Sequence, residues 1–158
     1  MKKVLIAVDR HASAEKIAKS GYAIASSMQS EIILAHVITE PAYYAEEYTE
    51  EYVRVKSFGV VYPGSKSTIL NNICQETIQF LSGIANQLGD MNIQVTALVG
   101  EIEKSLYEYC KSQNINLLIV GSHHRKGFKG LFVNDVVKHL LNHSDIPMLV
   151  IPTRNDNG

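Results

Sequence analysis

Five short apolar runs, separated by longer segments with helical periodicity, limit the possible folds of this chain more than any other feature. The runs cover residues 4–8, 32–37, 93–99, 117–120 and 148–151. Four of them are continuous, as in strands that are covered on both faces of a parallel sheet, and the third alternates. Strands that alternate with helices predict βαβ units, whose right-handed crossovers place helices on both faces. We therefore expect an α/β, Rossmann-like fold with a doubly wound, five-stranded parallel sheet.

Segments with helical spacing of apolar residues fill the gaps between these runs. They predict helices over residues 14–28, 68–88, 102–112 and 136–141, with Ser13 or Ala12 at the start of the first and Gly89 after the second. The length of 158 residues suits one domain. We expect a single domain over residues 1–153, followed by a flexible tail over 154–158.

The segment of about residues 40–67 is a long insertion, because a strand-to-helix connection usually has about 2 to 6 residues. Glutamates and tyrosines alternate in it, and Tyr44, Tyr48 and Tyr52 would share one face of a helix. We expect a surface helix whose tyrosines pack on the domain, with a ligand-stacking lid as the alternative. A glycine-rich stretch here is similar to a phosphate-binding loop, but Ser65 separates the second glycine from Lys66, so the required spacing is lost.

Charge and cysteine content exclude several classes of partner. The formal net charge is −1, so no overall field attracts nucleic acid or an anionic membrane. No apolar run approaches the roughly 20 residues of a membrane span. Cys74 and Cys110 lack the spacing of a metal or redox pair and indicate reduced thiols. We expect a cytoplasmic protein that binds neither nucleic acid nor a membrane.

A ligand site is expected beyond the carboxyl ends of the strands, where ligands bind in open α/β sheets. Asp9 ends the first strand and could accept a hydrogen bond from a ribose hydroxyl or an adenine amino group. Alternatively, it accepts hydrogen bonds from the amides of the loop or helix that follows. The loop after Gly121 is basic and leads into a helix, so its backbone amides and the helix N-terminus could hold an anion.

Two histidines on the last predicted helix, His139 and His143, are four residues apart. They could reach one metal ion, but a third ligand is missing. A histidine at a helix end also interacts favourably with the helix dipole, which makes capping the alternative. Together with His123 and His124 they leave open a metal or small-ligand sensor, although we assign no metal ligand.

The chain resembles the universal stress protein family over essentially its full length. The resemblance rests on motifs in the same order: VLIAVD at residues 4–9, LAHV at 34–37, VGE at 99–101, LIVGSH at 118–123 and HSDIPMLVI at 143–151. It implies the adenine nucleotide alpha hydrolase-like fold. It also implies an adenosine pocket near Asp9, Val37 and Val120.

The nucleotide-binding signature of that family is only partly present. It consists of Gly, two residues, Gly, nine residues, then Gly followed by Ser or Thr. Only the first glycine, Gly121, is kept, since His124 holds the second glycine position and Asn134 and Asp135 hold the final pair. A side chain at His124 narrows the phosphate cradle, and the Asp135 carboxylate repels a polyphosphate at the helix N-terminus. We expect Asn134 or Asp135 to be the N-cap of that helix.

The resemblance therefore implies a non-catalytic stress-response or regulatory protein with an altered nucleotide pocket. It also implies a homodimer through the last strand, Met148–Ile151, and the alternative is a module that binds ATP or AMP with at most slow ATP hydrolysis. No cofactor is certain, and ATP and AMP are the possible ones. The candidate ligand-binding residues are Asp9, Val37, Val120, Gly121, Ser122, His124, Arg125, Asn134, Asp135 and Val136.

Overall fold

The computed structural model describes residues 1–10, 12–39, 70–122 and 135–153 with their side chains. For residues 45–48, 52–55, 60–63, 66–69 and 133–134 it describes the backbone alone. The predicted tail over residues 154–158 lies outside the described residues and stays a prediction. Within the described parts of the chain, no helix is long and apolar enough to cross a membrane.

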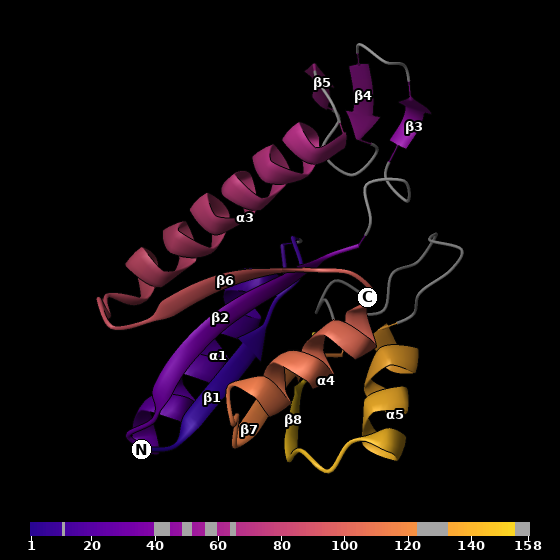
Figure 1. Ribbon diagram of the computed structural model, residues 1–158. Coiled ribbons are helices and arrows are strands. Elements are labelled where there is room, and N and C mark those ends of the chain that lie inside the picture. Colours follow the sequence, from indigo (N-terminus) through magenta and orange to yellow (C-terminus); the bar gives the residue numbers. More distant parts are fainter. Residues whose placement is uncertain are drawn as a thin grey trace.

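A five-stranded parallel sheet with the order β6-β2-β1-β7-β8 forms the centre of the structure (Figure 1). Its strands are β1 Lys3–Ala7, β2 Glu31–Ile38, β6 Gln94–Val99, β7 Leu117–Gly121 and β8 Met148–Ile151. The three central strands are almost wholly buried, which explains why they read as continuous apolar runs. The alternating run forms β6, an edge strand with exposed ends. The predicted fold class is confirmed.

Two helices cover each face of the sheet. Alternate residues of the strands divide between two apolar clusters, one shared with α1 Ala14–Ser27 and α3 Lys66–Leu88. The other is shared with α4 Ile102–Ser112 and α5 Val133–His143, which contact each other on the opposite face (Figure 1). Right-handed crossovers produce this division, because the chain winds outward from β1 first toward β6 and then toward β8.

The last helix, α5, begins earlier than its apolar periodicity predicts. It runs from Val133, so Asn134 and Asp135 are its second and third residues. The prediction that one of them is the N-cap is therefore wrong. The apolar periodicity begins only at Val136, and Asp135 before it is exposed.

The insertion forms strands in place of the predicted helix. They are β3 Ala45–Tyr48, β4 Tyr52–Val55 and β5 Val60–Pro63, paired in an antiparallel sheet in that order (Figure 1). The i, i+4 spacing of the tyrosines suggested a helix, but β-branched and aromatic residues fill β4 and β5 and favour extended backbone. The repeated valines of β4 and β5 favour strands, and the prediction from the tyrosine spacing did not take them into account. Tyr44 lies outside the described residues.

Candidate functional site

The strand order of the sheet determines where the candidate site lies, because the direction in which the chain adds strands reverses between β1 and β7. The connection after β1 leaves toward the face covered by α1, and the connection after β7 leads to α5 on the other face. A crevice at such a switch point is where open α/β sheets bind ligands. Asp9 follows β1 and Ser122 follows β7, so the structure brings the two predicted halves of the site to the same edge of the sheet.

Asp9 is half-buried and engaged with the start of the first helix. The hydroxyl of Ser13 donates to Oδ1 of Asp9 over 3.4 Å. Ser13 is the N-cap of α1, but its side chain makes no capping hydrogen bond to the helix backbone. Asp9 therefore accepts a hydrogen bond from the start of the first helix, donated by a side-chain hydroxyl, whereas the prediction named backbone amides. An ionised carboxylate has about four acceptor positions, so this hydrogen bond is compatible with a second one from a ligand hydroxyl.

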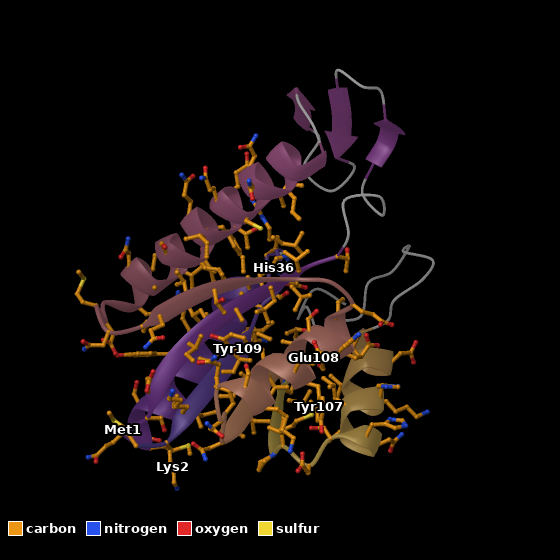
Figure 2. All side chains as sticks on the ribbon, viewed as in Figure 1. Met1, Lys2, His36, Tyr107, Glu108 and Tyr109 are labelled. Carbon is orange, nitrogen blue, oxygen red and sulfur yellow. The ribbon has the colours of Figure 1, made fainter. Side chains whose placement is uncertain are left out.

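His36 fixes the backbone that carries Asp9, and sequence reasoning missed this role. Nδ1 of His36 lies 2.8 Å from the carbonyl oxygen of Val8, and the Val8 amide donates to the carbonyl of Ala35 over 2.9 Å. Because a carbonyl accepts, the Nδ1 atom carries the hydrogen in this contact. Figure 2 shows His36 on β2, far from Met1 and Lys2 at the amino ends of the strands. The amide and the carbonyl of Val8 are thus both hydrogen-bonded to residues of β2.

Arg10 extends the site toward α3. The central carbon of its guanidinium group lies 5.2 Å from the centre of the Phe80 ring, a cation–π distance. This contact joins the loop after β1 to the middle of α3. No sequence pattern indicates it, because the two residues are brought together only by the packing of α3 on the sheet.

Gly121 has a packing role that the phosphate-loop interpretation did not foresee. A Cβ at this position would overlap Cδ1 of Ile17 and would lie 3.0 Å from Cγ1 of Ile17 and 3.1 Å from Cγ2 of Thr153. Its φ is not positive, unlike those of Gly89 and Gly100. The close approach of α1 to β7 therefore requires this glycine whether or not a phosphate binds.

The amide of Ser122 is not available for an anion. It donates to the carbonyl oxygen of Ile151 over 2.9 Å, which continues the β7–β8 pairing by one residue. The Oγ atom of Ser122 accepts a hydrogen bond from the amide of Thr153 over 3.3 Å. Ser122, the first residue of the loop after β7, is therefore hydrogen-bonded to β8 and to the residues that follow it.

The remaining candidates differ in what they present to a ligand. Val37, Val120 and Val136 are buried together in the cluster beneath α4 and α5, so they can only form an apolar floor. Asp135 is exposed in the first turn of α5, where its carboxylate interacts favourably with the helix dipole. His124 and Arg125 lie outside the described residues, and only the backbone of Asn134 is described.

Both cysteines are free thiols, and they differ in burial. Cys110 is 1% exposed within the cluster beneath α4, and burial raises the pKa of its thiol to about 12. Cys74 is half-buried on α3, and burial also raises its pKa above the ordinary value. Because the thiolate is the nucleophile, a raised pKa lowers the reactivity of a thiol at neutral pH.

We expect Cys110 to resist alkylation by iodoacetamide at pH 8 in the folded protein. Cys74 should react faster, because it is less buried. Both cysteines should react fully in urea, because unfolding exposes them. This control shows that the reagent is active and that each cysteine can be labelled. Peptide mass spectrometry after timed quenching measures the two rates. Labelling of Cys110 as fast as that of Cys74 in the folded state would contradict this expectation.

Known proteins resemble this chain both in sequence and in fold. The sequence model described as the universal stress protein family matches residues 1–152. This chain belongs to that family. A universal stress protein of Methanocaldococcus jannaschii is 22% identical over 156 residues, which cover 98% of this chain and 96% of the relative. The solved structure of that protein matches with a TM-score of 0.69 at 23% identity and covers 98% of both chains.

Two further solved universal stress protein structures contain adenine nucleotides. One is described as a complex with cAMP and has a TM-score of 0.57 at 17% identity, covering 95% of both chains. The other, from Arabidopsis thaliana, is described with AMP bound and has a TM-score of 0.57 at 13% identity, covering 99% of this chain and 95% of that one. At these identities the likeness establishes the fold.

Proposed function

We propose that this chain is a non-catalytic regulatory protein of the stress response, which acts in the cytoplasm and binds an adenine nucleotide with one phosphate. The observation that carries the proposal is the position of Asp9 at the switch point of the sheet. Its backbone is held by the hydrogen bonds of Val8, and its carboxylate faces the start of α1 through Ser13. A carboxylate held in this way is suited to accept from a ribose hydroxyl. The AMP and cAMP described for two structural relatives support this ligand class.

The preference for one phosphate follows from the other half of the site. The Ser122 amide is used by the sheet, and the Asp135 carboxylate occupies the first turn of α5. A chain of phosphates would lose an amide donor and meet a negative charge at the helix N-terminus, where anions otherwise bind. A monophosphate needs less of this surface. Because the triphosphate is disfavoured, we expect no ATP hydrolysis.

Calorimetric titration with AMP, cAMP, ADP and ATP, with and without Mg²⁺, tests the proposal. AMP or cAMP should bind more tightly than ATP. Asp9→Asn should weaken the AMP affinity about tenfold or more, because a charge-assisted hydrogen bond is lost. Glu15→Gln is the matched control, since it removes one exposed carboxylate from the first turn of α1 and should leave the affinity unchanged. Absence of heat with every nucleotide at millimolar concentration, or tighter binding of ATP than of AMP, would reject the proposal.

We further propose a homodimer through β8. Among the strands that the structure describes, β8 lies at one edge of the sheet, next to β7. An edge strand presents unpaired backbone groups that can pair with the same strand of a second copy. Light scattering coupled to size exclusion should give twice the chain mass at micromolar concentration. A strict monomer would contradict the dimer without affecting the nucleotide site.

A further inference from the structure

His139 and His143 form a pair of neighbouring imidazole rings on α5, and a role of His143 in capping the helix does not explain this pairing. Both side chains are exposed on α5, and their ring centres are 4.2 Å apart with an angle of 23° between the rings. The spacing of four residues places them on the same face of the helix, one turn apart. The two imidazoles are therefore stacked on each other at the exposed surface, near the carboxyl end of the helix.

The ring of His143 is already fixed by a hydrogen bond. Its Nδ1 atom lies 2.9 Å from the carbonyl oxygen of His139. Because the carbonyl can only accept, Nδ1 carries the hydrogen, and the lone pair of the neutral ring is at Nε2. Histidines that ligate metals usually donate the second ring N–H to a carbonyl or carboxylate, which fixes the tautomer and the ring orientation. His143 has this arrangement before any metal binds.

The surrounding charges favour a cation. His143 is the last residue of α5, where the helix dipole carries partial negative charge. Asp135 lies one turn before His139 on the same face. Lys138 is exposed nearby and opposes the cation, but its charge is at the end of a flexible side chain in solvent. Asp145 is engaged by Lys111, whose Nζ lies 2.7 Å from Oδ2 of Asp145.

We propose that His139 and His143 form an open surface site for one divalent transition-metal ion of the copper, zinc and nickel group. Two imidazole nitrogens on one ion, at bonds of about 2.0–2.1 Å, are about 3 to 3.5 Å apart. The ring centres are 4.2 Å apart and the rings are stacked, so the exposed rings have to turn until a nitrogen lone pair of each points at the same ion. Imidazole is a preferred ligand of these metals, and Cu²⁺ should bind most tightly. The described residues contain no group of three or more potential metal ligands, so water completes the coordination.

The two histidines are not among the candidate residues of the nucleotide pocket, although the charge of Asp135 lies near both sites. His143 is eight positions from Asp135, about 12 Å along α5, and His139 is four positions from it, about 6 Å. Failure of nucleotide binding therefore leaves this inference intact, and the reverse also holds.

The experiment uses the full chain without an affinity tag. Titration calorimetry with CuCl₂, and separately with ZnCl₂, should show one ion per chain. His139→Gln and His143→Gln should each weaken the affinity about tenfold or more, because one of two protein ligands is lost. A matched control, His143→Leu combined with Leu141→His, keeps the number of histidines but moves one to the neighbouring exposed position, which is 59% exposed. This control should lose the affinity as well, because a spacing of two residues faces opposite sides of the helix.

Two readouts separate this site from other histidines of the chain. Zn²⁺ should shift the NMR signals of the imidazole rings of His139 and His143 in the unaltered protein before those of any other histidine. Thermal midpoints without metal should be the same for wild type and variants, which shows that the fold is kept. Unchanged Cu²⁺ affinity in the double variant His139→Gln with His143→Gln would overturn the proposal. So would Zn²⁺ shifts confined to other histidines.

Discussion

Gly121→Ala is expected to lower the free energy of unfolding by about 2 to 3 kcal/mol, the upper part of the range for overpacking a core. The new Cβ would overlap Cδ1 of Ile17 and would lie 3.1 Å from Cγ2 of Thr153. Both neighbours are buried, so neither can move into solvent. Urea denaturation followed by circular dichroism measures the change.

The chain offers a matched control in Gly83, which lies inside α3. Apart from its chain neighbours and the backbone of its own helix, no atom lies within 4 Å of the position of a Cβ there. Gly83→Ala should raise the free energy of unfolding by about 0.5 to 1 kcal/mol, because alanine is the better helix former. Combining Gly121→Ala with Ile17→Val removes the overlapping Cδ1 atom, so the double variant should be less destabilised than the sum of the two. If Gly121→Ala proves as harmless as Gly83→Ala, the packing role of Gly121 is wrong.

Restoring the family signature should create ATP binding. The triple variant His124→Gly, Asn134→Gly and Asp135→Ser is expected to bind ATP about ten- to a hundredfold more tightly than the natural chain. The variant removes the carboxylate from the first turn of α5 and replaces it with a hydroxyl that can donate to phosphate. Calorimetric titration with ATP and Mg²⁺ measures the affinity.

A loss of stability accompanies this gain, because glycine in the first turn of α5 costs about 1 kcal/mol of helix stability. Glu103→Ser is the matched control, since it removes a carboxylate from the first turn of another helix, α4. It should leave ATP binding unchanged. An ATP affinity that stays the same in the triple variant, or rises equally in the control, would show that these positions do not determine the ligand.

The candidate pocket could be predicted only in part. The position of Asp9 and the end of β7 at one edge of the sheet could be predicted, because residues that follow buried parallel strands meet there, and their contact with a ligand stays a prediction. His36 and Arg10 were not found, since their partners Val8 and Phe80 come from other elements. The valines expected near adenosine are buried, which leaves their contact with a ligand a prediction.

Misleading local periodicity explains the error in the insertion. Three tyrosines at a spacing of four satisfied a helical pattern, yet the segment pairs as an antiparallel sheet in which Val53 lies opposite Tyr62. A pattern in one segment does not show which other segment it will pair with. Strand pairing is a contact between segments, and it overrides a short helical pattern.

The sequence by itself determined the five parallel strands, the helices that cover both faces and the family, because burial on one or both faces is encoded as a local periodicity of apolar residues. The tertiary structure alone decided why Gly121 must be a glycine, since Ile17 and Thr153 approach it from segments far apart in the chain. It also decided that the Ser122 amide belongs to the β7–β8 pairing. Close packing and hydrogen bonding between distant segments depend on where the strands lie side by side, and no local pattern specifies that.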